Sequence, residues 1–191
     1  MLCAPLGNDV NSNTTIIQNM DAFDSILLLL YCKGDAHIGR IALQKLAYIA
    51  GCKIPTLEMP PYKLQYYGPF SEELGRILER LVSTSFVSEN MTPGIYYESY
   101  DYSLNDDGVD ISNDLKNRPE YMMIGSFMNV CRETCNFDVA ALSYASKILY
   151  LMVDRSYDEA VLDAGESDWG LYRGDTQMGI EMLQRLNLVH V

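Results

Sequence analysis

Charged side chains recur through residues 71–85 at intervals of three and four, which would bring them together on one face of a helix. The set is Glu72, Glu73, Arg76, Glu79 and Arg80. Guanidinium groups bind phosphates or carboxylates, whereas carboxylates repel the phosphates of nucleic acid. Glu72 and Glu73 precede Arg76 by four and three residues, so both can neutralise its charge locally. We therefore expect a solvated or partner-facing helix that contacts protein, and the reading of DNA bases is the weaker alternative.

A second group of residues combines cations with aromatic rings on a segment that precedes this helix. The group consists of Arg40, Lys45, Lys53 and Lys63 with Tyr48, Tyr66 and Tyr67. Tyrosines beside cations suit base stacking and protein contact equally, and most such faces are simply solvated. If the chain binds duplex DNA, the expected contact residues are Arg40, Lys45, Lys63, Tyr67, Arg76 and Arg80.

Nucleophilic catalysis finds no support in the sequence. No serine stands in a Gly-x-Ser-x-Gly turn, and no glycine-rich loop suited to phosphate is present. His37 and His190 have no evident nucleophile beside them, and neither stands at a zinc-ligand spacing from Cys131 and Cys135. We expect these two cysteines to be buried thiols of a helix. The sequence thus predicts no enzyme, no metal and no cofactor, and a metal-dependent enzyme is the weakest hypothesis.

Residues 103–114, SLNDDGVDISND, partly match a calcium-binding loop. Asn105 and Asp107 stand at oxygen-ligand positions, and Asp114 ends the segment. Ser103, however, occupies a position where aspartate is required, and a strand pattern precedes the segment in place of a helix. A hairpin turn at 105–108 is the stronger interpretation.

Periodicity and cap residues predict the elements that position these side chains. Helices are expected at 19–31, 38–51, 71–85, 119–136, 138–154 and 175–186. The aromatic segment 62–67 predicts a strand that ends in a Gly68-Pro69 turn, and a hairpin is expected before the turn at 105–108.

Two of these helices invite more specific expectations. In helix 38–51, Ile41 and other apolar residues should face the core, and the outer face should carry Arg40, Gln44, Lys45 and Tyr48. Ser71 should cap the next helix, whose apolar positions are Leu74, Ile77, Leu78, Leu81 and Val82. Gly75 costs that helix about 1 kcal/mol relative to alanine, which a close approach by another helix or by a DNA backbone would explain equally well.

Composition limits the class of protein. The chain has 191 residues, 48% of them hydrophobic, and a net charge of −12 from 26 acidic and 14 basic residues. Such a charge repels nucleic acid and anionic membranes unless the bases gather on one face. The five cysteines favour reduced thiols, and neither a leader nor a membrane span is evident, so we expect a cytoplasmic protein with no membrane contact.

Three segments carry a family resemblance: IGRIALQKLAYIAG, YKLQYYGPFSEELGRILERLVSTSFV and YDYSLNDDGVDI. Together they resemble the YwgA-type family of uncharacterised prokaryotic proteins, and their core is similar to that of Panacea-type antitoxins and proteolytic adaptors. YASKILYLM, DWG and IEMLQRLNLV look like the later part of the same pattern. The resemblance implies a winged helix-turn-helix. This chain departs from the family in carrying Asn105, Asp106 and Asp107 where a wing usually has threonine and a basic residue.

The expected fold is α+β and mainly α, a winged helix-turn-helix core with a C-terminal helical subdomain. We divide the chain into a flexible arm (1–18), a winged-helix-like domain (19–115) and a helical subdomain packed on it (116–191). The expected function is that of a non-enzymatic regulatory protein, antitoxin- or adaptor-like, which binds a basic protein partner through residues 71–85, the wing and the acidic segment 156–170. The alternative is a dimeric DNA-binding transcription regulator, and homodimerisation is left open.

Overall fold

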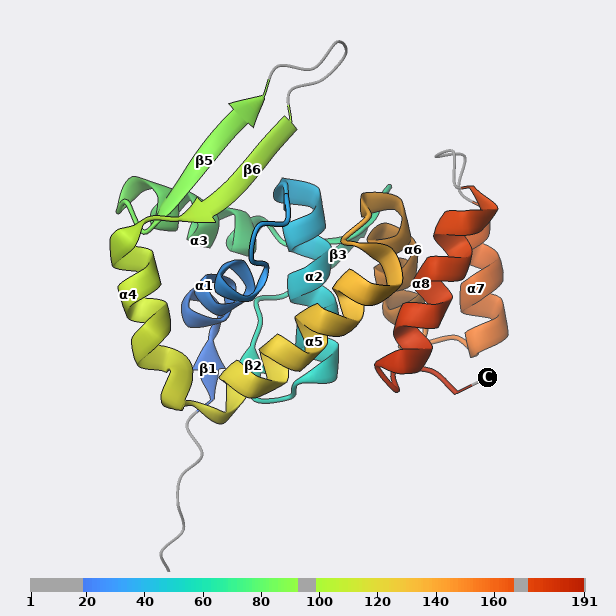
Figure 1. The fold of residues 1–191 in the computed structure, drawn as a ribbon. Helices are drawn as coiled ribbons and strands as arrows, with labels where there is room; N and C mark the ends of the chain where they lie inside the picture. Colours follow the sequence, from blue (N-terminus) through green and yellow to red (C-terminus); the bar gives the residue numbers. More distant parts are fainter. Residues whose placement is uncertain (1–18, 93–98, 167–171, 191) are drawn as a thin grey trace, which may run out of the picture.

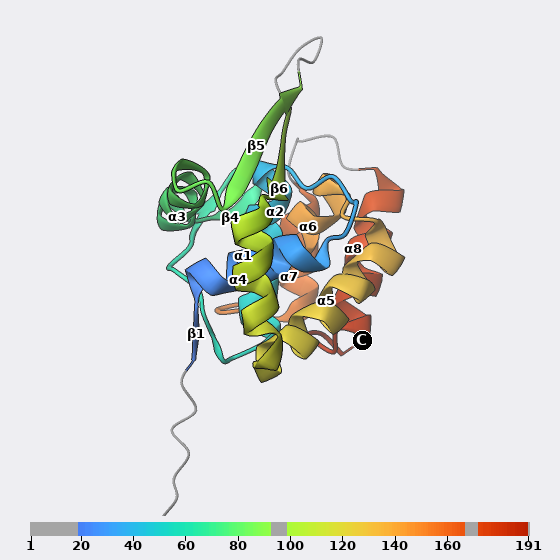
Figure 2. The same cartoon turned by 60° about the vertical axis from the view of Figure 1, so that its left-hand side comes forward.

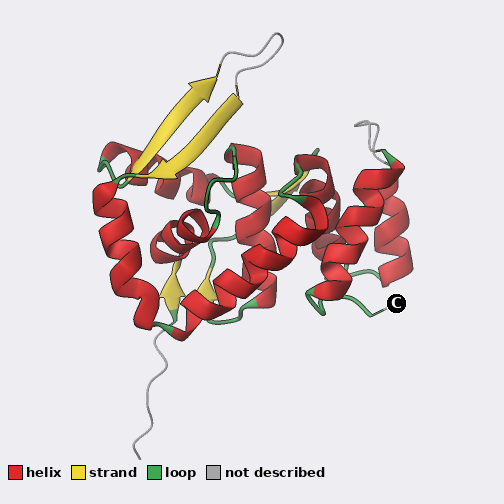
Figure 3. Ribbon diagram, viewed as in Figure 1, coloured by secondary structure: helices red, strands yellow, loops and turns green. Residues whose placement is uncertain are grey.

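The computed structural model describes residues 19–92, 99–166 and 172–190, and helices predominate over short strands in it (Figures 1 and 3). The predicted arm 1–18, the segments 93–98 and 167–171 and the motif DWG lie outside the described residues. The first half comprises β1 (Met20–Asp21), α1 (Ala22–Cys32), α2 (Arg40–Lys53), β2 (Leu57–Glu58), β3 (Lys63–Gln65), β4 (Gly68–Phe70), α3 (Glu72–Ser83), β5 (Val87–Thr92) and β6 (Ser99–Leu104). The second half comprises α4 (Asp106–Asp114), a 3₁₀ turn (Leu115–Asn117), α5 (Pro119–Cys135), α6 (Val139–Leu151), α7 (Tyr157–Gly165) and α8 (Arg173–Arg185).

Helix α1 lies at the centre of the first half, with α2, α3 and α4 around it (Figure 1). The run Ile26–Leu30 is buried on all sides, as expected for a helix that is apolar all round. Asp21 caps the helix by accepting a hydrogen bond from Asp24 N at 2.9 Å. Arg132 of α5 donates hydrogen bonds to the carbonyl oxygens of Cys32 and Lys33, at 2.9 and 3.1 Å. These carbonyl groups at the C-terminal end of α1 therefore have a donor.

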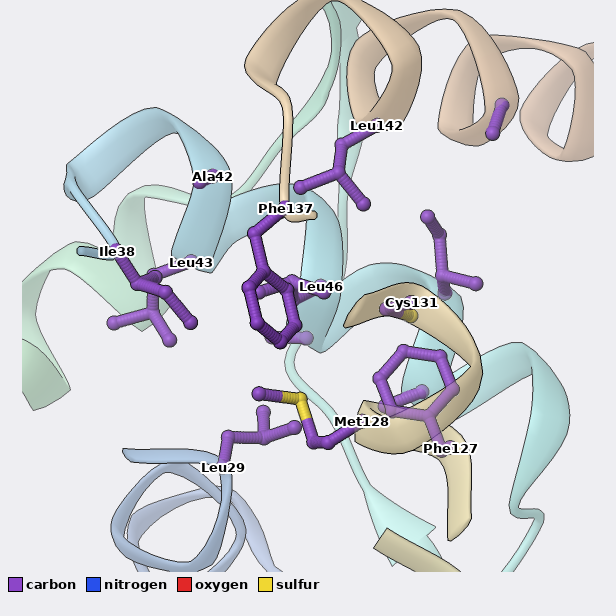
Figure 4. Packing of buried hydrophobic residues seen from close by; sticks show 14 of the residues in the cluster. Leu29, Ile38, Ala42, Leu43, Leu46, Phe127, Met128, Cys131, Phe137 and Leu142 are labelled. Atoms are coloured by element: carbon purple, nitrogen blue, oxygen red, sulfur yellow. The ribbon is translucent and has the colours of Figure 1, made fainter. Parts of the chain in front are cut away.

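One hydrophobic core continues across residue 115, so the two predicted subdomains share it. Figure 4 shows Leu29 of α1, Leu46 of α2 and Met128 of α5 directed toward one another, with Phe137 above them. Helix α6 packs against α2 and β4, and α8 packs against α5 and α6. Cys131 and Cys135 lie in this core, as predicted. Among the described residues, no helix combines the length and apolar character needed to cross a bilayer.

The prediction for the faces of α2 is partly wrong. Gln44 and Lys45, expected on the outer face, are buried, whereas Ile41, expected in the core, is 48% exposed. The cause is tertiary, because β4 and α6 pack against the side of α2 that carries the polar residues. Burial of these two side chains is compatible with their polarity because both form hydrogen bonds with the backbone of residues 69–71.

Two predicted turns are also wrong. Gly68 and Pro69 belong to β4, which pairs antiparallel with β3, and the turn is at Tyr66 and Tyr67. Asn105 is the N-cap of α4, so the segment 105–108 opens a helix, and a calcium loop is excluded. Gly108 is needed there because an added Cβ would lie 2.2 Å from the carbonyl oxygen of Phe86.

The hairpin β5–β6 is present, and both of its strands precede the segment 105–108, where a turn was predicted. Its register runs from Val87 opposite Leu104 to Thr92 opposite Ser99, and the connection 93–98 is outside the described residues. The hairpin projects from the helical body beside α3 (Figures 1 and 2). Helix α7, which was not predicted, begins at a capping box in which Ser156 and Glu159 bond each other's backbone N–H.

Candidate interaction surface around helix α3

Helix α3 exposes all five charged residues that the sequence singled out. Ser71 caps it by accepting a hydrogen bond from Leu74 N at 3.2 Å, as predicted. Leu74, Leu78 and Leu81 are buried. The opposite side carries Glu72, Glu73, Arg76, Glu79 and Arg80 in contact with solvent. Three carboxylates and two guanidinium groups therefore share the exposed surface of this helix.

The salt bridge within this set is weak. Arg76 Nη2 lies 3.8 Å from Glu72 Oε2, and both side chains are about 70% exposed. An exposed pair of this kind contributes about 0–1 kcal/mol to stability, since solvent screens it. These side chains therefore remain free to form closer pairs with a bound molecule.

A groove of about 490 Å³ lies between α3, the start of α2 and the hairpin. Phe70, Leu78 and Val82 supply apolar surface, while Arg40, Glu79 and Glu89 are among its charged lining residues. Gly75 also lines the groove, and no atom lies within 4 Å of a Cβ built there. Of the two explanations for Gly75, a close helix–helix approach is not found among the described residues, and the missing side chain leaves the groove open.

At one side of this groove, Arg40 is bound to the hairpin. Arg40 Nη2 donates to Glu89 Oε1 at 2.8 Å, Arg40 Nε donates to Tyr102 Oη at 3.1 Å, and Tyr102 Oη donates to the same carboxylate oxygen. The Arg40 guanidinium also lies 4.8 Å from the centre of the Tyr100 ring. Hydrogen bonds from Tyr102 and Arg40 hold the pKa of Glu89 below its usual value, so the carboxylate stays charged and neutralises the arginine.

Glu89 and Tyr102 were not singled out from the sequence. They lie on the paired strands β5 and β6, opposite each other, and Arg40 is distant in sequence from both. The alternation of the hairpin could have placed Glu89 and Tyr102 on one face, but nothing local identifies Arg40 as their partner. A neighbouring pair also fixes the hairpin: Asp101 accepts from Ile38 N at 2.8 Å and lies 3.4 Å from His37 Nδ1.

Lys45, expected among the DNA-contacting residues, is not available for such contacts. Its side chain is 3% exposed, and Nζ donates to the carbonyl oxygen of Pro69 at 2.7 Å. Burial lowers its pKa from 10.5 to about 8. Inclusion of Lys45 in an exposed basic face is therefore wrong.

The other cations of the predicted DNA surface each face carboxylates. Lys63 and Arg76 line a shallow hollow together with Glu72 and Glu73. Arg80 lines another hollow together with Asp21, Glu58 and Glu73. Tyr67 is half exposed at the turn between β3 and β4. Over the described residues, the surface around α3 thus alternates in sign and forms no continuous cationic ridge.

The described part of the acidic segment, helix α7, does not join this surface. Helix α7 packs against α6 and lies at the opposite end of the molecule from α3 (Figure 1). Its continuation, 167–171, is outside the described residues. A compact partner that covers α3 and the hairpin would therefore not reach α7, contrary to the expectation that all three segments meet one partner.

Metal ligands do not cluster in the described part of the chain. No group of three or more histidine, cysteine, aspartate or glutamate side chains is placed to hold an ion there. Cys135 Sγ donates to the carbonyl oxygen of Cys131 at 3.2 Å, and burial raises the pKa of both thiols. These two thiols are therefore poor metal ligands and weak nucleophiles in the folded chain.

Comparison with known proteins gives one informative similarity. The chain is 36% identical over 83 residues to an uncharacterized protein, YwgA, of Bacillus subtilis (strain 168). The match covers 43% of this chain and 49% of that relative, so it spans about half of the relative's length. No family model matches the chain. The similarity supports a relation to YwgA-type proteins over part of the sequence.

Proposed function

We propose that this chain is a non-enzymatic regulatory protein of the YwgA type, with a winged-helix-like scaffold that binds a polypeptide partner through α3. In this scaffold α1, α2 and α3 form the three-helix unit, and the hairpin β5–β6 is the wing. The order of these elements along the chain and the position of the hairpin beside α3 support the assignment. Helix α3 then occupies the place of a recognition helix.

The charge balance around α3 is the observation that carries this proposal. Non-specific and much specific DNA affinity arises when unneutralised lysine and arginine side chains displace counterions from phosphates. Here Arg40 is paired with Glu89, Lys45 is buried, and Arg76 and Arg80 are interleaved with Glu72, Glu73 and Glu79. The carboxylates of this surface would repel a phosphate backbone. The same carboxylates would accept hydrogen bonds from the basic side chains of a polypeptide.

The groove beside α3 also suits a polypeptide. Protein interfaces combine a desolvated apolar centre with a polar, charged rim. Phe70, Leu78 and Val82 provide the apolar centre, and the open space at Gly75 admits a side chain of the partner. By analogy with the antitoxins and adaptors that the sequence resembles, the function would be to hold a second protein through this surface.

Charge reversal tests the proposal. In Glu72→Lys/Glu73→Lys the first turn of α3 loses its two carboxylates, and the amount of partner that co-purifies with the tagged chain should fall at least tenfold. The matched control is Asp106→Lys/Asp107→Lys, because these acids occupy the same first-turn positions of α4 and are also exposed. Both double variants change the net charge by the same amount and suffer the same unfavourable interaction with a helix dipole. Equal capture by the wild type and the α3 variant would refute the proposal.

The rival function is DNA binding by a dimer, favoured by the arrangement of α2, α3 and the hairpin. A gel-shift titration with mixed-sequence duplex DNA at several salt concentrations separates the two functions. The proposal predicts no shift at low salt, whereas contacts to several phosphates would give an affinity that falls steeply as salt rises. A steep salt dependence that Arg76→Ala and Arg80→Ala reduce would establish the rival.

A further inference from the structure

A second cleft lies beside the first half of α2, away from the exposed face of α3. Its volume is about 340 Å³, and the turn between β3 and β4 forms its other wall. The lining residues are Arg40, Ile41, Gln44, Lys45, Gln65, Tyr66, Tyr67, Gly68 and Phe70. None of these residues is acidic, in a chain with 26 acids and 14 bases, whereas the hollows around α3 all include glutamates.

Lys45 gives this cleft an unusual chemistry. An ammonium group has three N–H donors, and the structure shows one hydrogen bond, from Nζ to the carbonyl oxygen of Pro69. That acceptor is neutral, and the side chain is 3% exposed. Burial of an ammonium without a counter-charge is expensive, so such a group usually finds an anion or serves a functional site.

The charged and titratable groups that face Lys45 do not supply that anion. Arg40 is on the same helix and is already paired with Glu89. Tyr66 and Tyr67 lie on the turn. From α6, Lys147 approaches the same strand, since a Cβ added at Gly68 would lie 3.5 Å from Lys147 Cβ. None of these neighbours is a carboxylate.

Aromatic and aliphatic side chains form much of the remaining wall of the cleft, and the cleft is open to solvent. Ile41, Tyr66 and Tyr67 are each about half exposed, and the two tyrosine rings meet edge to face with centres 4.9 Å apart. Phe70 adds a further ring. The volume is at the lower end of the range for small-molecule sites. Because Lys45 supplies a single buried positive charge to this cleft, the site suits a single negative charge better than a phosphate dianion.

We propose that this cleft binds a small organic monocarboxylate, with the carboxylate on Lys45 Nζ and the apolar body against Ile41, Tyr66 and Phe70. This inference does not depend on the partner that α3 binds, because Lys45 carries its charge and does not line the groove beside α3, although Arg40, Gln44 and Phe70 line both hollows. It assigns the chain a small-molecule site of the kind that an effector would occupy.

Calorimetric titration with 3-phenylpropionate, and with 3-phenylpropionamide as the uncharged match, tests the inference on the full chain at pH 7. We expect a dissociation constant on the order of 1 mM or tighter for the acid. The amide should bind at least tenfold more weakly because its neutral carbonyl oxygen accepts a weaker hydrogen bond from an ammonium group than a carboxylate does. Affinity for the acid should fall between pH 7 and pH 9.5, since Lys45 loses its proton near pH 8.

Variants localise the binding. Lys45→Met should weaken binding of the acid at least tenfold, and Lys63→Met, on the exposed strand β3, should leave it unchanged. Because Lys45→Met alters a buried site, the exposed position Ile41 provides a second pair. Ile41→Glu should abolish binding of the acid, and Ile41→Lys should retain it.

Four results would overturn the inference. The first is no binding of 3-phenylpropionate up to 20 mM, and the second is equal affinity for the acid and the amide. The third is tighter binding of the tripeptide acetyl-Gly-Gly-Phe with a free carboxylate, which would identify the cleft as a site for polypeptide C-termini. The fourth is retention of acid binding in both Lys45→Met and Ile41→Glu, which would show that the ligand binds at another place on the chain.

Discussion

Replacement of Lys45 by methionine tests how the structure treats its buried amine. Methionine has a similar length and no charge, so the substitution removes the ammonium and preserves most of the packing volume. The carbonyl oxygen of Pro69 loses its donor, which lowers stability equally at every pH. The informative quantity is therefore the pH dependence of the difference between variant and wild type.

The magnitude follows from the pKa of the amine. The folded state lowers it from 10.5 to about 8. Below pH 8 the amine is protonated in both states, and the folded wild type bears the full cost of the buried charge. Between about pH 8 and 10.5 the unfolded chain binds a proton that the folded chain has released, so the free energy of unfolding rises with pH. A pKa shift of this size corresponds to a change of about 3 kcal/mol in the free energy of unfolding. The Lys45→Met variant has no amine at this position and should not show this change.

Urea unfolding followed by circular dichroism under reducing conditions measures the effect at pH 7, 8, 9 and 10. The free energy of unfolding of Lys45→Met minus that of the wild type should decrease by about 2–3 kcal/mol across this range. Burial raises the pKa of several tyrosines and thiols, which adds a further pH dependence to stability, but these groups are present in both proteins and their effects cancel in the difference. Lys63→Met, which changes an exposed lysine, should show a constant difference. A constant difference for Lys45→Met too would refute the claim that the folded chain holds this amine in a desolvated site.

Three further substitutions test the description of the fold. Gly75→Ala should raise the free energy of unfolding by about 1 kcal/mol, because an added Cβ meets no atom within 4 Å and the residue is inside a helix. Gly108→Ala should lower it by about 2–3 kcal/mol, because the Cβ would lie 2.2 Å from the carbonyl oxygen of Phe86; urea denaturation of both variants should give opposite signs. Glu89→Gln should lower it by about 1 kcal/mol at pH 7, since hydrogen bonds from Tyr102 to a charged acceptor are weakened. Because the folded state lowers the pKa of Glu89, this last difference should be full above the usual pKa of 4.5 and disappear as the pH falls below it.

Local patterns in the sequence predicted the main helices well. The three-four spacing of apolar residues and the cap at Ser71 predicted α3 and its exposed charges. The uniformly apolar run Ile26–Leu30 predicted a buried helix, and α1 is central. These features depend on neighbours within one or two turns, so the sequence alone contains the information.

Features that depend on distant contacts were not predictable in the same way. The burial of Gln44 and Lys45 is decided by β4 and α6, which lie outside the helix itself, and α6 follows α2 only after a long stretch of chain. The buried amide of Gln44 exchanges its hydrogen bonds with water for hydrogen bonds with the protein, because it both donates to and accepts from the backbone of Ser71. The pairing of Arg40 with Glu89 and Tyr102 likewise joins a helix to a hairpin.

The segment 105–108 was predicted as a turn from its composition, but it forms the start of helix α4. Asparagine, aspartate and glycine favour turns, but asparagine and aspartate also favour the N-cap and first turn of a helix. In α4, Asn105 stands at the N-cap position, with its side chain bonded to Ser88 and Ser85, and the acids after it occupy the first turn. The pattern Ser156-x-x-Glu159 was a recognisable capping box, and it could have identified α7.

The most direct test of the central claim is photo-crosslinking from α3 in the cell. A photoreactive phenylalanine analogue at Glu79, on the exposed face of α3, should crosslink to one defined polypeptide that mass spectrometry can identify. The same analogue at Val153, an 84% exposed position after α6, should not crosslink to that polypeptide. Crosslinks from Glu79 to DNA, or the same products from both positions, would contradict the proposal that α3 binds a protein partner.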